Sequence, residues 1–535
     1  MVLVLADVSV QGEVPFDRVV PMKNTLTTAN CSPMNVMFIM SDQHIASCLG
    51  VEGHPQVKTP NIDRLARSGV RFTNAYTQNP ICTPSRVSLL SGQYPHNHGY
   101  FGLAGPTPRA LPSFISHFRT AGYRTAAIGK LHLPDNPKNW LADDLDYYGE
   151  CYRTIDGRAG ESAYFQYLDR LGLRADEDSR LMPETNTTYY DSRPSRLPLE
   201  HCVEHWITER SIEFVEECRC LKRPFCMEVS LPRPHPQLTP DQRFWDMYPE
   251  DIEAPSTLEQ DVSHRPPHFQ KIAAKLKQHK WLFPPDEFHA GSRRVWRGYL
   301  GCITQIDYFV GKLLDHLEST GLAHNTIVVF GADHGAFNGM HAVQEKSPGL
   351  SSEAVCRVPF IWRVPGVSQT NIACKELVEN VDLAPTVTAL CGLPPMESTD
   401  GKNITSLLRG ESVPVREVAV TENPWSKALR WERWRYVHYV PEMFSGAQMG
   451  ELYDIEADPL EAINLYLSAQ HQEIVAECRN RLLNWIMTTT RVVTCHPSLN
   501  DATMGIHAYA TAGDGKESNL VGPAERVRRG LRNCV

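Results

Sequence analysis

Residues 326–333 read TIVVFGAD, an uninterrupted apolar and β-branched run that ends in an aspartate. A run of this length and composition predicts a strand that is buried on both faces. It follows a long segment in which apolar residues recur at helical spacing, among them Trp296, Leu300, Ile303 and Val310. A helix followed by a doubly buried strand is the repeating unit of a parallel sheet that is covered by helices.

The same unit recurs elsewhere in the chain. The runs NVMFIM (35–40), RTAAIG (124–129) and PFCMEVSL (224–231) each lie next to a segment with helical spacing. This alternation predicts an α/β fold with a large, mostly parallel central sheet flanked by helices. After about residue 410, short strand-like segments such as EVAVTENP, WRYVHYV and ELYDIEADP precede one terminal helical pattern. We therefore predict a smaller C-terminal α+β subdomain that contains a short antiparallel sheet.

A chain of 535 residues exceeds the size that one hydrophobic core usually serves. We divide it into a loosely ordered lead-in (1–34), a large α/β domain (35–410), an antiparallel-sheet and helix subdomain (411–495) and a C-terminal extension (496–535). Residues 240–290 are rich in proline, histidine and charge and lack a clean period. We expect them to form an insertion over the edge of the sheet that could serve as a pocket wall.

Composition narrows the class of protein. The net charge of −9 argues against a general binder of nucleic acid or of anionic membranes. No apolar run is long enough to span a bilayer, and the N-terminus is a poor signal peptide. The 15 cysteines are scattered and lack metal-finger spacing, which favours a reducing cytoplasm. Asn-x-Ser/Thr triplets at Asn30, Asn186 and Asn403 leave a secreted or periplasmic location open.

Polar side chains follow all four of the predicted central strands. These residues are Asp42 and Gln43, then Lys130 and His132, then His235, and finally Asp333 and His334. One such residue would ordinarily be a loop residue. Because the carboxyl ends of parallel strands share one edge of the sheet, four sets together indicate a binding or catalytic site.

Four of these residues form a candidate divalent-metal set, namely Asp42, Gln43, Asp333 and His334. Carboxylate and amide oxygens suit hard cations, and one imidazole admits Mn²⁺ as well as Ca²⁺ or Mg²⁺. Each pair alone could be a turn or a helix cap, so the indication comes from their joint position at the sheet edge.

The stretch ICTPSRVSLLSG (81–92) is typical of a helix start. Pro84 suits the first turn, and Cys82 would then lie at the positive end of the helix dipole, where anions bind. Arg86, one turn later, could orient a charged group there. Cys82 could be an inert cysteine beside a capped helix or a cysteine-protease-type nucleophile, but neither explains the accompanying metal set.

At this point the sequence resembles the type I sulfatases of the alkaline-phosphatase-like superfamily. Cys82-Thr-Pro-Ser-Arg86, followed by SLLSGQYPHNHG, is similar to the family's Cys-x-Pro-Ser-Arg maturation signal. Further family-like blocks are TPNIDRLARSGVRFTNAY, AGYRTAAIGKLHL, RVPFIWRVPG and ELYDIEADPLEAINL, so the resemblance spans roughly residues 35 to 490. It implies an alkaline-phosphatase-like fold and a catalytic role for the large domain.

The resemblance also implies a chemistry. Cys82 would be oxidised by a separate formylglycine-generating enzyme to Cα-formylglycine (3-oxoalanine), whose hydrated aldehyde is the nucleophile. Asp42, Gln43, Asp333, His334 and the modified Cys82 would hold one divalent metal, with Ca²⁺ favoured and Mn²⁺ or Mg²⁺ as alternatives. The basic residues around the sulfate would be Arg86, Lys130, His132, His235 and Lys346, with Lys130, His235 and Lys346 binding the substrate.

Within that chemistry, Lys130 and Lys346 would spread the charge of the transferring group. His235 would protonate the leaving oxygen, and His132 would take the proton from the remaining hydroxyl as sulfate departs. The implied partners are a small-molecule or saccharide sulfate ester and the maturing enzyme. The oligomeric state is left open, with a homo-oligomer as one possibility.

Three positions depart from the common family pattern. Gln43 stands where many members have aspartate, His334 where many have asparagine, and Ser351-Ser352-Glu353 where a Tyr-Glu is common. The first two occur in branches that include choline sulfatases and phosphonate monoester or phosphodiester hydrolases. The main hypothesis is therefore a sulfatase, the second is a phosphonate monoester or phosphodiester hydrolase, and the third is a catalytically inactive anion-binding scaffold.

Overall fold

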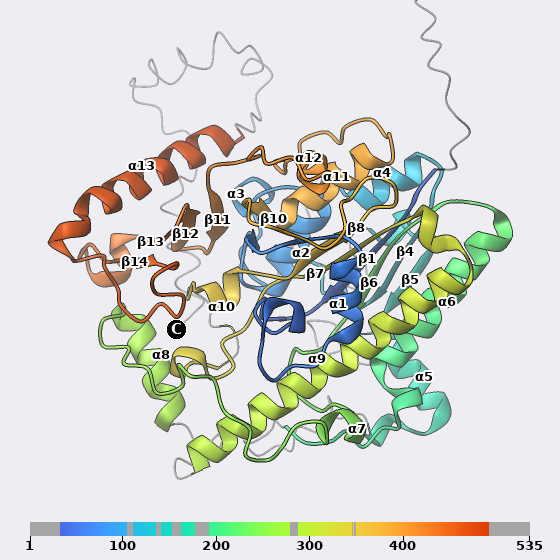
Figure 1. The fold of residues 1–535 in the computed structure, drawn as a ribbon, viewed down its shortest axis with the longest axis horizontal. Helices are drawn as coiled ribbons and strands as arrows, with labels where there is room; N and C mark the ends of the chain where they lie inside the picture. Colours follow the sequence, from blue (N-terminus) through green and yellow to red (C-terminus); the bar gives the residue numbers. More distant parts are fainter. Residues whose placement is uncertain are drawn as a thin grey trace, which may run out of the picture. The chain divides into compact units, whose positions relative to one another are not determined.

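The computed structural model describes residues 33–103, 111–134, 141–151, 162–176, 192–278, 287–344, 346 and 349–491. Most of the predicted lead-in, the whole predicted extension (496–535), and Asn30 and Asn186 lie outside these residues. Strands and helices alternate along most of the described chain, as the sequence predicts (Figure 1).

The central feature is an eight-stranded sheet in the order β5-β4-β6-β1-β7-β8-β2-β9. Five adjacent strands pair in parallel, namely β5 (Tyr147–Glu150), β4 (Arg124–Gly129), β6 (Phe225–Leu231), β1 (Asn35–Ser41) and β7 (Thr326–Ala332). β8 (Phe360–Arg363) is antiparallel to β7, and β2 (Val70–Phe72) and β9 (Ile372–Cys374) complete the edge. The prediction of a large, mostly parallel sheet is confirmed.

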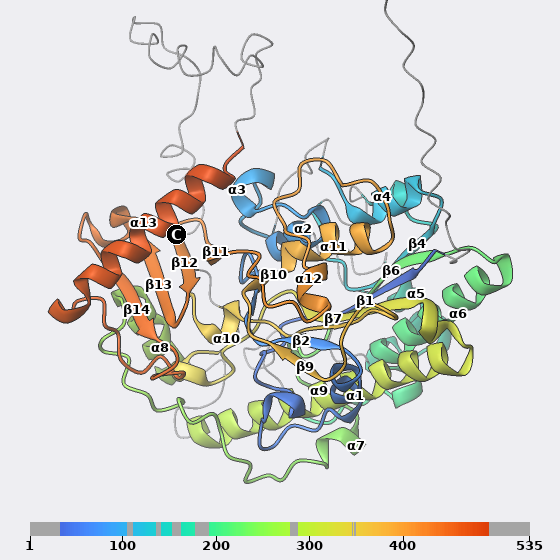
Figure 2. The same ribbon diagram turned by 45° about the horizontal axis from the view of Figure 1, so that its top comes forward.

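Both faces of the sheet are covered by helices because its strands are apolar on both sides. Along β1, Val36, Phe38 and Met40 pack into one hydrophobic cluster, while Met37 and Ile39 pack into the other. The first face carries α2 (Cys82–Ser91), α4 (Phe114–Thr120), α11 (Leu383–Leu390) and α12 (Thr405–Leu408). The second carries α1 (Pro60–Arg67), α5 (Ala163–Leu171), α6 (Val203–Leu221) and α9 (Phe288–Ser319) (Figure 2).

A second, four-stranded antiparallel sheet lies in the C-terminal part of the described chain. It contains β11 (Ala419–Glu422), β12 (Ser426–Trp431), β13 (Trp434–Tyr439) and β14 (Gly450–Asp454), in that order. The terminal helix α13 (Gln472–Thr489) packs on it through Val475, Cys478 and Leu482. The predicted antiparallel-sheet subdomain is therefore present, and it includes a strand, β12, that the sequence pattern did not reveal.

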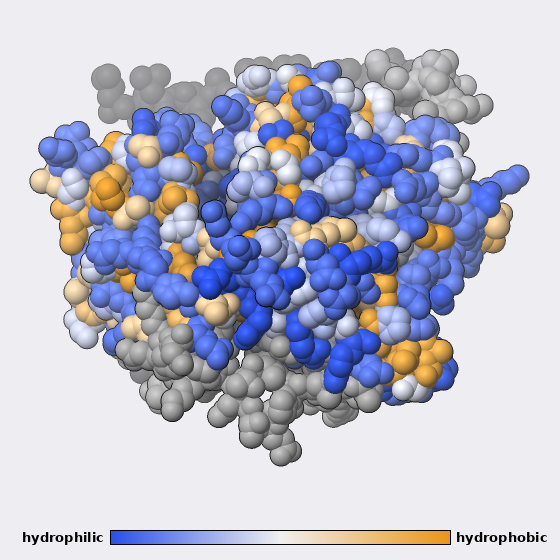
Figure 3. All heavy atoms as spheres, turned by 60° about the horizontal axis from the view of Figure 1, so that its bottom comes forward, coloured by the Kyte–Doolittle hydropathy of each residue, from blue (hydrophilic) through white to orange (hydrophobic). Residues whose placement is uncertain are grey.

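Smaller elements connect these parts. β3 (Ala75–Tyr76) pairs with β10 (Val378–Glu379), and the short helices are α3 (Pro95–His98), α7 (Gln242–Trp245) and α10 (Glu353–Cys356). The region 240–290 also contains the helix α8 (Pro267–Gln278), which the sequence pattern did not predict. No described helix is long and apolar enough to cross a membrane. Hydrophilic residues predominate on the face shown in Figure 3, and hydrophobic ones form separate small groups there.

Candidate active site

The site lies at the carboxyl ends of four neighbouring strands. Lys130 directly follows β4, and His235 follows β6 after a short turn. Asp42 directly follows β1, and Asp333 directly follows β7. Because β4, β6, β1 and β7 are adjacent in the sheet, their ends bring these side chains to one place.

Cys82 is the first residue of α2, as predicted. Ile81 before it is extended, and the Ile81 N–H donates to Asn79 Oδ1 at 3.0 Å. Every residue of α2 is buried, and Cys82 is only 1% exposed. Its Sγ lies 3.2 Å from His334 Nε2 and 3.8 Å from Asp42 Oδ1. The positive end of a buried helix therefore points at the strand ends.

Arg86, one turn into α2, bridges the two buried carboxylates. Its Nη2 lies 2.7 Å from Asp42 Oδ2, and its Nε lies 2.9 Å from Asp333 Oδ2. Its Nη1 donates to the Lys130 carbonyl and to Ser230 Oγ. The guanidinium is 1% exposed and both carboxylates are fully buried, so Arg86 compensates charges that water cannot reach. The predicted basic residue is thus part of the framework that holds the carboxylates.

Two lysines also converge on the site. Lys130 Nζ lies 2.7 Å from Asp42 Oδ2. Lys346 Nζ donates to Gln43 Oε1 at 2.7 Å, although 303 positions separate the two residues in sequence. The structure thus places Lys346 beside Gln43, one of the residues of the predicted metal set.

The histidines are oriented by backbone carbonyls. His334 Nδ1 lies 2.8 Å from the Gly335 carbonyl oxygen. Because a carbonyl oxygen can only accept a hydrogen bond, Nδ1 carries a proton, and Nε2 faces Cys82. His235 is held in the same way by the Pro236 oxygen at 2.8 Å, which leaves its Nε2 for other contacts. His132 reaches the Cys82 side chain from the turn after β4.

The donor set fits a hard divalent cation. One ligand atom each from Asp42, Cys82, Asp333 and His334 lies within 4.8 Å of the others, and all four residues are buried. The Gln43 backbone N–H donates to Asp333 Oδ1 at 3.0 Å, which fixes that carboxylate. Mostly oxygen donors with a single imidazole suit Ca²⁺, Mg²⁺ or Mn²⁺.

The surroundings of residue 82 favour a negative charge. Burial and Asp42 raise the pKa of the Cys82 thiol, but Lys346, Lys130 and His334 outweigh them and bring it well below its usual value. Burial likewise opposes ionisation of Asp42, yet Lys130, His235 and Arg86 together hold its pKa well below the usual range. The site is therefore built to stabilise an anion at position 82.

Two residues of β6 at the site escaped the sequence analysis. Ser230 Oγ donates to the Lys130 carbonyl at 2.6 Å and accepts from Arg86. Glu228 is 1% exposed, and burial raises its pKa to about 7 despite the nearby Arg86. A glutamate inside the apolar run PFCMEVSL was a usable signal, because carboxylates are rarely buried without a partner.

The structure also contains a separate cavity of about 460 Å³. Residues 253–257 line it together with Ile45, Trp296, Ala354 and Leu460, so part of the 240–290 region does form a pocket wall, as expected. None of the predicted site residues lines this cavity. The cavity therefore does not identify the chemical group that would be bound next to residue 82.

Comparison with known sequences finds relatives among the sulfatases. A family model described as "Sulfatase" matches residues 34–393, and one described as "N-sulphoglucosamine sulphohydrolase, C-terminal" matches residues 349–488. The chain is 29% identical to a choline-sulfatase of Rhizobium meliloti, over 81% of this chain and 82% of the relative. It is 28% identical to an arylsulfatase of Clostridium perfringens, over 84% of this chain and 93% of the relative.

The fold is also found among solved structures. The phosphonate monoester hydrolase of Agrobacterium radiobacter superposes with a TM-score of 0.73 at 20% identity, over 85% of this chain and 96% of that one. At this level of identity, the likeness establishes the architecture alone.

Proposed function

Because the chain belongs to the sulfatase family, within the alkaline-phosphatase-like superfamily, we propose that Cys82 is the residue at which it hydrolyses sulfate monoesters. The products are an alcohol and inorganic sulfate. The observation that carries this assignment is the position of Cys82. It is the first residue of a Cys-x-Pro-Ser-Arg motif and of a buried helix, and the surrounding charges favour an anion there.

Members of this family use a formylglycine and a metal. The residues proposed to hold the metal are Asp42, Gln43, Asp333, His334 and the modified residue 82, and we propose Ca²⁺ because most of these donors are oxygens. When present, the metal and the hydrated aldehyde together supply an oxygen nucleophile at neutral pH. The formylglycine-generating enzyme is accordingly a proposed partner.

The side chains of this protein then bind the ester and move protons. Lys130 and Lys346 would neutralise the oxygens of the transferring sulfate. His235 would donate a proton from Nε2 to the leaving oxygen, while its Nδ1 stays bonded to the Pro236 carbonyl. Burial, then Lys130 and Lys346, lower the pKa of His235, and the negative charge of a bound ester counteracts these lysines. His132, which contacts residue 82, would remove the proton whose loss releases sulfate.

The alcohol half of the substrate is proposed only as a class. The relatives include a choline-sulfatase, an arylsulfatase and an ulvan-active sulfatase of Formosa agariphila. We therefore propose a small organic or saccharide sulfate. A cytoplasmic location is proposed as well, supported by the cysteines of the described chain, which are free thiols.

A sulfate ester should be a better substrate than a phosphonate monoester. The competing function, phosphonate monoester or phosphodiester hydrolysis, is favoured by Gln43 and His334. A phosphonate monoester carries the same single charge, but a carbon substituent replaces one oxygen that Lys130 or Lys346 could neutralise. We expect kcat/KM for p-nitrophenyl sulfate to exceed that for p-nitrophenyl phenylphosphonate at least about tenfold, measured on matured protein. The reverse preference would reject the sulfatase assignment in favour of its competitor.

Replacing His235 by asparagine should slow hydrolysis in a way that depends on the leaving group. We expect kcat for an alkyl sulfate to fall by about 10²–10⁴-fold, because an alkoxide needs a proton as it leaves. The loss on p-nitrophenyl sulfate should be much smaller, because p-nitrophenolate is stable without that proton. Equal losses on both esters would show that His235 acts in binding and not as the general acid.

A further inference from the structure

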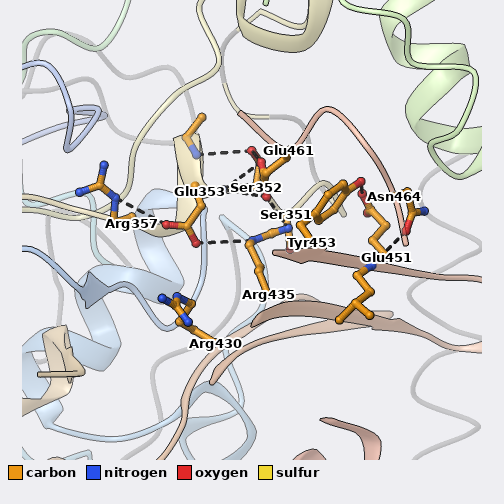
Figure 4. Close-up of polar contacts among 12 residues, drawn as sticks. Ser351, Ser352, Glu353, Arg357, Arg430, Arg435, Glu451, Tyr453, Glu461 and Asn464 are labelled. Atoms are coloured by element: carbon orange, nitrogen blue, oxygen red, sulfur yellow. Dashed lines mark hydrogen bonds and ion pairs between the residues drawn. The ribbon is translucent and has the colours of Figure 1, made fainter. Parts of the chain in front are cut away.

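A buried carboxylate outside the site, Glu461, connects the antiparallel-sheet subdomain to the large domain. It follows β14 and is 1% exposed. Its carboxylate pairs with Arg435 of β13, with Oε1 2.7 Å from Nη1, and it accepts a hydrogen bond from Ser352 Oγ. Figure 4 shows Glu461 above Ser352 and Arg435, with Glu353 lying between Arg357 and Arg435.

The contacts of Glu461 reach both sides of Lys346 in sequence. On the N-terminal side, His341 Nε2 lies 3.5 Å from Glu461 Oε2. On the C-terminal side are Ser352 and the backbone N–H of Glu353, which lies 3.3 Å from the same oxygen. A single carboxylate therefore fixes the described chain before and after the lysine that reaches Gln43.

The β11–β12 hairpin contacts the same stretch. Asn423 Nδ2 donates to Ser351 Oγ at 3.1 Å. At Gly349, whose φ is +81°, a Cβ would lie only 2.2 Å from Trp425 Nε1, so the indole packs directly on the backbone. The subdomain thus contacts this stretch through at least two separate elements.

Two residues in these contacts, Glu461 and His341, adopt backbone conformations that cost free energy. Glu461 and His341 adopt left-handed φ values of 49° and 54°, which are unfavourable for residues with a Cβ. Such conformations persist only where the surrounding contacts impose them. Arg265 supplies one of these contacts, because its Nη2 donates to the Glu461 carbonyl at 3.0 Å.

We propose that Glu461 is a positioning residue for Lys346, and that the antiparallel-sheet subdomain thereby sets the geometry of sulfate transfer. Glu461 holds His341 and Ser352, which flank Lys346, and Lys346 then meets Gln43 and the transferring sulfate. This inference rests on the proposed role of Lys346. It assigns a catalytic consequence to a residue of the small subdomain that does not touch the reacting atoms.

The chain offers a matched control in Glu451. This second buried carboxylate of the subdomain pairs with Arg265 at 2.9 Å and accepts hydrogen bonds from Tyr439 and Tyr453. Among the described residues, its side chain contacts neither Ser352 nor Lys346, and Arg265, which it shares with Glu461, is retained in both variants. A loss of stability shared by Glu461→Gln and Glu451→Gln therefore reports on folding, and a loss of kcat confined to Glu461→Gln reports on positioning.

The experiment is a double-mutant cycle on matured protein with p-nitrophenyl sulfate. We expect Glu461→Gln to lower kcat about 10²-fold and Ser352→Ala about 10-fold, because small displacements of a catalytic group have effects of this size. In a Lys346→Ala background, neither substitution should lower kcat further. Glu451→Gln should keep kcat within about twofold, with thermal unfolding measured for every variant.

Two outcomes would overturn the inference, and they are distinguishable. In the first outcome, Lys346→Ala lowers kcat, but Glu461→Gln and Ser352→Ala lower kcat by the same factor in the parent protein and in the Lys346→Ala variant. Glu461 then does not position Lys346, while the proposed function stands. If Lys346→Ala has the activity of the parent protein, the proposed role of Lys346 fails and the positioning role fails with it. Ser352→Ala removes only a hydroxyl group, so the cycle remains decisive if Glu461→Gln does not fold.

Discussion

Protein with Cys82→Ala should hydrolyse no sulfate ester above background, with kcat reduced by about 10⁴-fold or more. Alanine cannot be oxidised to formylglycine, so the variant lacks the proposed nucleophile and one ligand of the proposed metal. The fold should persist, because alanine fits within α2 and the cost of losing one sulfur is about 1 kcal/mol. Turnover of p-nitrophenyl sulfate by protein that is co-expressed with a formylglycine-generating enzyme measures the effect.

A second cysteine serves as the control for this substitution. Cys220, which is exposed near the end of α6, should tolerate alanine with no change in kcat. Mass spectrometry of the tryptic peptide that contains residue 82 should find the aldehyde in the parent protein. An active preparation with an intact Cys82 thiol would refute the formylglycine mechanism.

Arg86→Met should destabilise the protein by about 3–5 kcal/mol in the absence of added metal. Methionine has a similar length, but it leaves the carboxylates of Asp42 and Asp333 buried without the guanidinium that bridges them. The main-chain carbonyl of Lys130 also loses its hydrogen bond from Arg86. Urea unfolding after dialysis against a chelator, followed by addition of Ca²⁺, measures both the loss and any recovery through metal binding.

The matched control for Arg86 is an arginine at the surface. Arg64 pairs with Asp315 and Glu318, but its side chain is 39% exposed, so Arg64→Met should cost at most about 1 kcal/mol. A cost for Arg86→Met as small as that of Arg64→Met would mean that the buried carboxylates are neutral or compensated in another way.

The sequence predicts the central strands well because they are buried on both faces. β1 and β7 therefore appear as nearly continuous apolar runs, and β4 and β6 appear as apolar runs with only a few polar residues. β12 escapes because SKALRW mixes charge with apolar residues, as expected in a sheet with unequal faces. The short strands β2 and β9 carry too few residues for any period to be visible.

The site residues also differ in how well the sequence predicts their positions. Asp42, Lys130 and Asp333 directly follow recognisable strands, so their convergence can be anticipated from topology. The contact of Lys346 with Gln43 depends on how two distant loops pack, and no local pattern encodes it. The partners of Glu461 are equally distant in sequence, and ELYDIEADPLEAINL alone does not reveal whether this glutamate faces solvent or Ser352.

The burial of Cys82 has a consequence for the history of each molecule. Only 1% of its surface is exposed, and an entire buried helix follows it. If Cys82 is oxidised by a separate enzyme, as proposed, the oxidation has to come before α2 packs, because the folded protein covers the thiol. The thiol of each new chain would therefore be accessible to that enzyme only during the interval before α2 packs. Under the proposed mechanism, a molecule that folds before it is oxidised would be inactive, and it would have to unfold before the thiol could be oxidised.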